Sequence, residues 1–299
     1  MIERRKIFYA FSGILILASI ASLAVFGLPL GIDFKGGSLM EITFEAESDG
    51  GAIPQRDEIS SALSEFKIGE LSIQSTNENS YILRFDTVDQ DTHTAILEKL
   101  GGLEGSTVNE DRFDSIGPTI GAETARKSLQ AMGLVSFMIV VYVAWAFRKV
   151  KYPLNSWSWG VVVLMTLFHD IIITVGFFSV YAHFASAEVG VPFVAGLLTI
   201  LGYSVTDTVV VFDRVRENLL RFGSKIPFPE LANKSVKETL VRSLNVSLTT
   251  LFVLFAVLFF GGDTIRSFIL TLIIGISVGT YSSVALASPL LVTWAGRKN

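Results

Sequence analysis

Six stretches of this chain are long enough and apolar enough to cross a lipid bilayer, which limits the fold more than any other feature. They cover residues 7–28, 129–147, 157–181, 191–212, 244–260 and 268–292. A helix of roughly 17 to 25 apolar residues spans the hydrocarbon of a membrane. Residues 7–28 exceed the apolar core of a signal peptide, so they are expected to stay as an anchor. The chain is therefore predicted to be a polytopic α-helical membrane protein with six transmembrane helices.

The basic residues lie at alternate ends of successive spans, in residues 4–6, 148–151, 214–225 and 297–298. Cytoplasmic loops of membrane proteins are rich in Lys and Arg, so both termini are predicted to be cytoplasmic. The long segment between the first and second spans is then extracytoplasmic, and it is acidic. The chain has no cysteine, which excludes disulfides and any chemistry that depends on a thiol.

The extracytoplasmic segment has periodic patterns in place of continuous apolar runs. Residues 38–45 alternate like a strand, and Ile59, Leu63 and Phe66 follow helical spacing. Further signals give the order strand, helix, strand, strand, helix, strand, which predicts a small α+β domain of ferredoxin-like type. His93, in the second of these helices, is expected to be solvated and to bind no metal. The chain thus divides into a first transmembrane helix (1–30), the extracytoplasmic domain (31–122) and a five-helix bundle (123–299).

Paired glycines occur where the first span meets this domain, in the stretch GIDFKGG. The stretch lacks the Lys-Ser/Thr ending and the helical context of a phosphate-binding loop. It is therefore predicted to be a turn between the first helix and the first strand.

Ionisable residues inside the spans are candidates for function, because a charge at the centre of a bilayer costs at least about 2.5 kcal/mol. Asp207 lies in the fourth helix, and Arg242 begins the fifth. At helical spacing, each belongs to a polar stripe on its own helix, and the two stripes are expected to face each other. An ion pair or a water-mediated contact between Asp207 and Arg242 could then form. Secondary candidates are Tyr203, Thr206, Asn245, Thr249, His169 and Asp170.

Small residues recur every four positions in the sixth span, at Gly275, Gly279, Ser283 and Ala287. Such a ridge lets two helices approach closely. It is assigned to helix packing, and if it faces outward it would receive a partner subunit.

Four motifs together resemble the signatures of the SecF proteins in the SecD/SecF family, part of the resistance-nodulation-division superfamily. They are GIDFKGGSLMEI, FHD, GYSVTDTVVVFDRVREN and RSLNVSLTTL. The resemblance covers the whole six-helix layout, and it implies protein export across the bacterial cytoplasmic membrane. It also implies a SecD partner with six further helices, the SecYEG channel, often YajC, and unfolded preprotein as substrate, with no nucleic acid.

The resemblance further implies roles for two residues. The helix 4 aspartate and helix 5 arginine that the family uses in proton passage correspond to Asp207 and Arg242. A subunit of this kind is no enzyme but a motor, driven by the proton motive force, and it needs no cofactor. The length is that of a separate SecF or of the SecF part of a fused SecDF.

Three alternatives remain at this point. The chain could be a scaffold for the channel without ion flux, or it could couple to sodium, since hydroxyls near Asp207 supply oxygen donors. An intramembrane aspartyl protease would have to pair Asp170 with Asp207. The adjacent His169 and the absence of a Gly-x-Gly-Asp motif disfavour that last function.

Overall fold

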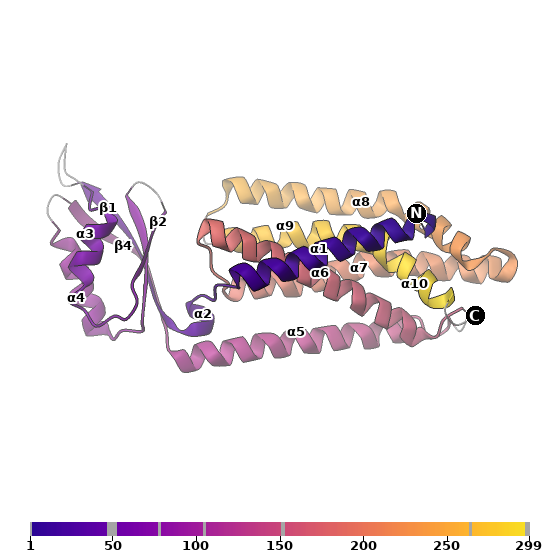
Figure 1. Ribbon diagram of the computed structural model, residues 1–299, viewed down its shortest axis with the longest axis horizontal. Coiled ribbons are helices and arrows are strands. Elements are labelled where there is room, and N and C mark those ends of the chain that lie inside the picture. Colours follow the sequence, from indigo (N-terminus) through magenta and orange to yellow (C-terminus); the bar gives the residue numbers. More distant parts are fainter. Residues whose placement is uncertain are drawn as a thin grey trace. The chain divides into compact units, whose positions relative to one another are not determined.

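The computed structural model describes residues 2–46, 53–76, 79–103, 106–150, 153–262 and 265–296. Contacts divide the chain into two units, Met1–Pro29 with Leu129–Asn299, and Leu30–Ser128. The first unit is helical, and the second contains a sheet (Figure 1). The boundary between the units falls within one long helix, α5 (Pro118–Ala146).

Within the described residues, six helices are long and apolar enough to cross a membrane, which confirms the predicted number of spans. The last of them contains three segments, of which the middle one, η4, is π-helical. The spans, with the short helices at their ends, are η1 (Ile2–Arg4) and α1 (Arg5–Phe26), α5, α6 (Ser156–Ala185), α7 (Val191–Phe222) and η2 (Gly223–Lys225), α8 (Phe228–Phe260), and α9 (Arg266–Ser282) with η4 (Ser283–Ala287) and α10 (Ser288–Gly296).

Three of these helices extend at least ten residues beyond their predicted spans, and one of them is α5, which begins at Pro118 and not at residue 129. The fourth span was expected to end at residue 212 and the fifth to begin at 244, but α7 reaches Phe222 and α8 starts at Phe228. The added turns keep an apolar face, with Val215 and Leu231 fully buried. The two helices therefore continue to pack on each other where charged residues suggested that the spans end. Arg242 consequently lies inside α8 and not at its beginning.

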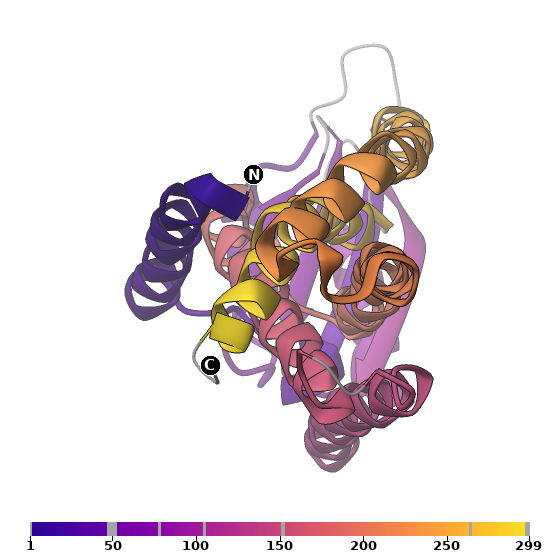
Figure 2. The same ribbon diagram turned by 90° about the vertical axis from the view of Figure 1, so that its right-hand side faces the viewer.

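Helix α9 lies at the centre of the helical unit. It packs against α6, α7 and α8, and the end-on view shows this arrangement (Figure 2). Two thirds of the most apolar part of the sixth span, which comprises α9, η4 and α10, is buried, whereas less than a fifth of the corresponding parts of α1, α5 and α8 is buried in the isolated chain. Residues on α9 can therefore contact several helices at once.

Helix α1 is held on α6 by small residues. A Cβ atom on Gly176 would lie 2.3 Å from the Cβ of Ser19 and 2.5 Å from its Cα. At the same crossing, the Ser22 hydroxyl donates to the carbonyl of Gly176 at 2.8 Å. Close packing and interhelical hydrogen bonds are the main attractions between helices in lipid. Gly176 is therefore essential for this contact.

The second unit contains an antiparallel sheet with the strand order β2-β3-β1-β4. Strands and helices follow one another in the predicted order, and each of the helices α3 and α4 joins two strands that flank a third. The core lies under alternate residues of β1, where Met40, Ile42 and Phe44 are fully buried. The elements are α2 (Ile32–Lys35), β1 (Gly37–Ala46), α3 (Arg56–Leu63), β2 (Ser72–Ser75), β3 (Ser80–Phe85), α4 (Gln90–Gly101) and β4 (Ser106–Ile116).

The prediction that His93 is solvated is wrong. His93 is buried, its Nε2 lies 2.8 Å from Oε1 of Glu110, and its ring stacks on Phe113 with 4.0 Å between centroids. The reason is helical periodicity, because His93, Ile96 and Leu100 share the face of α4 that is buried in this unit. The carboxylate of Glu110 satisfies the imidazole there.

The paired glycines form the turn between α2 and β1. Gly36 and Gly37 have φ angles of 82° and 123°, which favour glycine. A Cβ on Gly36 would lie 2.7 Å from Cα of Pro118, and a Cβ on Gly121 would lie 2.7 Å from the Gly36 nitrogen. The backbone of this turn therefore touches the first turn of α5 directly, and neither glycine has room for a side chain.

We expect the variant Gly176→Ala to lower the free energy of unfolding by about 1–3 kcal/mol, because the added methyl group overpacks against Ser19. Gly133→Ala is the matched control, since a Cβ there meets nothing within 4 Å. The alanine at position 133 should leave stability unchanged or raise it by up to about 1 kcal/mol. Denaturant unfolding in detergent micelles measures both. Equal stability of the two variants would contradict the assigned packing role.

Candidate functional site

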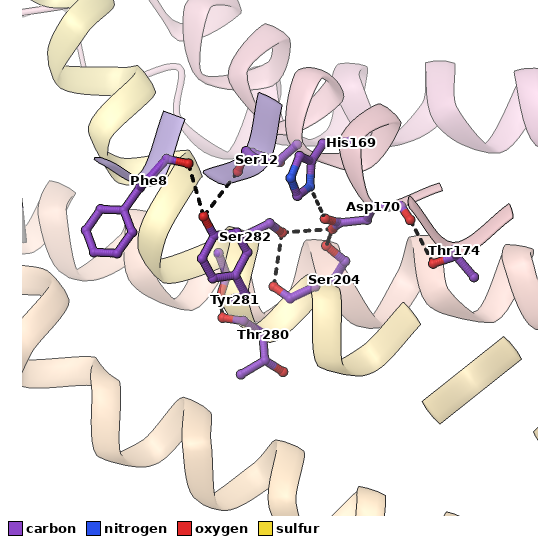
Figure 3. Close-up of polar contacts among 12 residues, drawn as sticks. Phe8, Ser12, His169, Asp170, Thr174, Ser204, Thr280, Tyr281 and Ser282 are labelled. Atoms are coloured by element: carbon purple, nitrogen blue, oxygen red, sulfur yellow. Dashed lines mark hydrogen bonds and ion pairs between the residues drawn. The ribbon is translucent and has the colours of Figure 1, made fainter. Parts of the chain in front are cut away.

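The most deeply buried acid of the helical unit is Asp170, on α6, with no exposed surface. Its Oδ1 lies 2.9 Å from Nδ1 of His169. Its Oδ2 accepts hydrogen bonds from Ser204 of α7 at 2.6 Å and from Ser282 of α9 at 2.9 Å (Figure 3). A buried carboxylate is tolerated only when its oxygens have such partners. Asp170 thus joins three helices at one point.

The second acid, Asp207, is connected to the same helices. It is half-buried on α7, one turn after Ser204, and it accepts a hydrogen bond from the hydroxyl of Ser283. Ser282 and Ser283 are adjacent in sequence, so two neighbouring serines contact acids on two different helices. We call Asp170, Ser204, Asp207, Ser282 and Ser283 the serine–carboxylate cluster.

The backbone at Ser283 is unusual, because the π-helical segment η4 begins there. Pro289 explains it. Proline has no N–H to bond the carbonyl four residues earlier, that of Ala285, and its ring displaces that carbonyl, so the regular α-helical pattern is interrupted. π-Helical turns within α-helices are frequent at functional sites. Here the widened turn begins where the chain contacts Asp207.

The small-residue ridge of the sixth span packs inside the chain. Gly275, Gly279, Ser283 and Ala287 are all buried. A Cβ on Gly275 would lie 2.1 Å from Cδ1 of Ile200, and one on Gly279 would lie 3.1 Å from Cβ of Ser204. The ridge therefore brings α9 against α7, and it also supplies Ser283 to the cluster.

His169 extends the polar contacts toward α1. The imidazole is buried, and among the described residues its Nε2 has no hydrogen-bond partner. Its ring lies beside that of Tyr281, at 6.2 Å between centroids. The Tyr281 hydroxyl is 3.2 Å from the Ser12 hydroxyl and donates to the carbonyl of Phe8 at 3.2 Å (Figure 3).

Within the described residues, Asp207 and Arg242 form no ion pair. Arg242 is exposed on α8, and it has no ion pair with any residue that the structure describes. Tyr203, from the predicted stripe on α7, donates its hydroxyl to Thr250 of α8 at 3.4 Å, a residue next to the predicted stripe and not part of it. Other secondary candidates are exposed as well: Thr206, Asn245 and Thr249. The cause is the rotation of α8 about its axis, since Ser243, about 100° from Arg242, occupies the buried face.

The sequence analysis missed Ser204 and Ser282 and assigned Ser283 to packing alone. The only sequence signal was a hydroxyl residue inside an apolar run. Ser204 lies three residues before Asp207 in the fourth span, and Ser282 lies in the sixth span. Such hydroxyls usually bond to their own helix. Their partners became evident only from the packing of α6, α7 and α9.

The cluster contains two carboxylates among hydroxyl groups, with His169 beside Asp170, and groups of this kind are able to accept and release protons. No group of three His, Asp or Glu side chains suited to a metal occurs in the described part of the chain. The two acids bind serines and are not hydrogen-bonded to each other. An aspartyl protease needs two carboxylates that share one proton, so the arrangement does not support that activity.

Comparison with known proteins agrees with this layout. Residues 96–297 match the family described as protein export membrane protein SecD/SecF, C-terminal, and residues 21–47 match the SecD/SecF GG motif. Protein translocase subunit SecF of Anaerolinea thermophila is 36% identical over 98% of this chain and 93% of that protein. The corresponding subunit of Sebaldella termitidis is 38% identical over 97% and 90%. The chain belongs to the SecD/SecF family, among its SecF proteins.

The fold of this SecF-family chain is also found in solved structures. The crystal structure of SecDF, a translocon-associated membrane protein from Thermus thermophilus, matches with a TM-score of 0.82 at 30% identity. That match covers 99% of this chain but only 38% of the SecDF chain. SecDF in its super-membrane-facing form matches with a TM-score of 0.68, also at 30% identity. The chain is therefore a multi-pass membrane protein of a family of transport components, with the fold of one part of SecDF.

Asp170→Ala should destabilise the helical unit by about 3 kcal/mol, because it leaves His169, Ser204 and Ser282 buried without their common acceptor. Asp213→Ala is the matched control: Asp213 is exposed and pairs only with Arg216 one turn away, so its loss should change stability by less than about 0.5 kcal/mol. Denaturant unfolding of both variants in detergent tests this. If Asp170→Ala were as stable as the control, Asp170 would not hold the three helices together.

Proposed function

We propose that this chain is a SecF subunit that uses the proton motive force to promote polypeptide translocation across the bacterial cytoplasmic membrane. The observation that supports this proposal is the serine–carboxylate cluster. Acids inside membrane helices are costly and are usually retained for ion or proton movement. Asp170 and Asp207 are held by hydroxyls of neighbouring helices, so a change in protonation would alter helix packing.

The hydrogen bond between Asp207 and Ser283 suggests how protonation of Asp207 would change the packing of α9 on α7. An ionised carboxylate only accepts hydrogen bonds, whereas a protonated one also donates. If the proton binds Oδ2 of Asp207, that oxygen would donate to the Ser283 hydroxyl, which would then turn away from its role as donor; Ser283 lies at the start of the π-helical segment. A membrane potential of 100 mV supplies about 2.3 kcal/mol per proton, comparable to the free-energy gap between two conformations. One proton can thus bias the position of α9 against α7.

We infer the topology and partners from charge and from the relatives. Both termini would be cytoplasmic, and residues 31–122 would lie outside, where they could act on the emerging preprotein. SecD, the SecYEG channel and YajC are the expected partners, since the SecDF relative is described as translocon-associated. The exposed Arg242 supports a second subunit at α8, because an arginine at this depth is too costly to face lipid. In that complex, Arg242 would line the proton path with Asp207.

Sodium could replace the proton as coupling ion. The cluster presents carboxylate and hydroxyl oxygens, the donors that hard cations prefer. A scaffold without any ion flux would use Asp170 for helix packing alone and would not need Asp207 to exchange a proton. Sodium coupling and the scaffold each predict a different result from proton coupling when preprotein export into vesicles is measured with and without an ion gradient.

The variant Asp207→Asn should abolish the part of preprotein export that depends on a proton gradient, because the amide cannot take up or release the proton. Export into vesicles that contain the full chain with SecD and SecYEG is measured with and without the gradient. Asp213→Asn, six positions along the same helix and exposed, should keep full stimulation.

Two results would contradict the proposal. Wild-type stimulation in the Asp207→Asn vesicles would favour the scaffold. Stimulation by a sodium gradient but not by a proton gradient, in the unmodified complex, would assign the coupling to sodium.

A further inference from the structure

The first turns of α8 carry an open recess that the proposed function does not use. Its volume is about 350 Å³, and it is lined by Glu230, Asn233, Lys234, Lys237 and Glu238. These residues precede the long apolar part of the helix, and most of them are exposed. The recess therefore faces the surroundings of α8 and not the interior of the bundle, and its volume is sufficient for a small ligand group.

Two cations in this recess lie outside any ion pair. Among the described residues, neither Lys234 nor Lys237 has a carboxylate within ion-pair distance. Lys234 lies over the ring of Phe222, with its Nζ 4.2 Å from the centroid, and interacts with Glu238 only at longer range. Glu238 itself is paired with Arg214. A ligand that contacts both ammonium groups must therefore be an anion.

The position of Lys237 along α8 places it at the level of lipid headgroups. Exposed apolar side chains occur on α8 from Val241 to Phe260, over about 29 Å, which is close to the ~30 Å of bilayer hydrocarbon. Lys237 precedes Val241 by about 6 Å, within a headgroup layer of roughly 5 to 7 Å. Lys234 is one turn earlier, and its flexible stem can extend into that layer. Glu230 lies about 16 Å before Val241 and thus beyond the layer.

The two lysines share a face of α8 with exposed apolar residues. Spacings of three and four residues bring one such set together: Lys234, Lys237, Val241, Leu244 and Leu248. The three apolar members are exposed. Arg242 is rotated by about 100° from Val241, so the surface inferred for a second subunit is a different face. The face with the lysines offers an apolar surface for acyl chains and a basic end for a headgroup.

The first residues of the chain add positive charge at the same level. Ile2 packs on the start of α8, and its backbone nitrogen donates to Oδ1 of Asn233 at 3.4 Å (Figure 1). Both α1 and α8 start near this contact, so Lys6, four residues after Ile2, lies near the level of Lys237, four residues after Asn233. Exposed apolar residues of α1 begin at Ile7. The two helices therefore change from basic to apolar at one depth.

We propose that this recess binds the headgroup phosphate of an anionic phospholipid of the cytoplasmic leaflet, with Lys234 and Lys237 as its ligands. Basic pockets beside transmembrane helices on the cytoplasmic side bind such headgroups. The acyl chains lie along Val241, Leu244 and Leu248. The choice of leaflet rests on the proposed orientation of the chain, whereas the site itself is independent of ion coupling.

The simplest alternative is that the lysines only orient the chain in the membrane, as basic residues of cytoplasmic loops do. Any basic pair at the turn between α7 and α8 would then attract anionic lipid equally. Arg221 and Lys225 are exposed at this turn. Because α7 and α8 are antiparallel and Arg214 pairs with Glu238, Arg221 lies near the level of residue 231, well before the apolar face. Arg221 and Lys225 therefore provide a matched control.

The full chain, purified in detergent, is titrated with phosphatidylglycerol, and native mass spectrometry gives the dissociation constant of the first bound lipid. Lys234→Gln combined with Lys237→Gln should weaken binding about 25-fold, because each basic residue near an anionic surface contributes about fivefold. Arg221→Gln combined with Lys225→Gln removes the same charge and should weaken binding by less than about twofold. Lys234→Arg combined with Lys237→Arg keeps the charge and should retain the affinity.

Three results would overturn the lipid site. The first is equal affinity of the unmodified chain and the Lys234→Gln, Lys237→Gln variant for phosphatidylglycerol, or equal affinity of the unmodified chain for phosphatidylglycerol and phosphatidylcholine. The second is an equal loss in the Arg221→Gln, Lys225→Gln control, which would leave only a general attraction of basic residues for lipid. The third is complete displacement of the lipid by excess inorganic phosphate, which would assign the recess to a soluble anion.

A protein partner at the recess gives a different result. The Lys234→Gln, Lys237→Gln variant would then bind phosphatidylglycerol normally but recover less SecD or SecYEG from membranes, and the lipid site would fail. No arm of this experiment involves Asp207. A lipid site that passes these tests therefore stands even if Asp207→Asn exports normally and the proposed proton coupling fails.

Discussion

Inside the hydrocarbon of a membrane there is no water to bond polar groups, so the protein must supply every partner itself. This constraint requires helices for the spans, and it also decides where the few polar side chains can lie. Asp170 is tolerated because donors from its own helix, α7 and α9 converge on it. The close contact of α1 with α6 likewise uses Ser22 on the carbonyl of Gly176, in addition to small residues. Polar contacts therefore determine which helices of this bundle lie side by side.

Asp170 and Asp207 are connected through the sixth span, because Ser282 at the end of α9 binds Asp170 and Ser283 at the start of η4 binds Asp207. Gly279 allows α9 to approach Ser204, and the residues that follow, Ser282 and Ser283, each bind one of the acids. Because these serines are adjacent, one cannot move without the other. A change in the hydrogen bond at Asp207 would then be transmitted to the surroundings of Asp170 without any direct contact between the carboxylates. The irregular helix that Pro289 imposes lies where such a movement costs least.

The sequence could predict features that depend on local properties. The length of the apolar runs was enough for the six spans, and the cost of burying a charge was enough to select Asp170 and Asp207. Properties that depend on the rotation of a helix or on distant partners could not be predicted in this way. Arg242 and Ser243 are neighbours with opposite environments, and Ser282 is 112 positions from Asp170. The extra turns of α7 and α8 were not predicted because they contain many charged residues. Their buried apolar residues, such as Val215 and Leu231, are too few to form a continuous apolar run in the sequence.

Helix α8 has polar residues on two of its faces. Its buried face carries the hydroxyls of Ser235, Thr239, Ser243 and Ser247, and its exposed face carries Arg242 with Asn245 and Thr249. A charged group on the exposed face is stable in a membrane only if another protein surface or water covers it. Asp207 on the neighbouring helix α7 is half-buried, and its carboxylate contacts Ser283. In the proposed function, the Asp207 carboxyl would exchange a proton with each side of the membrane in turn, and its contact with Ser283 would couple that exchange to a shift of α9.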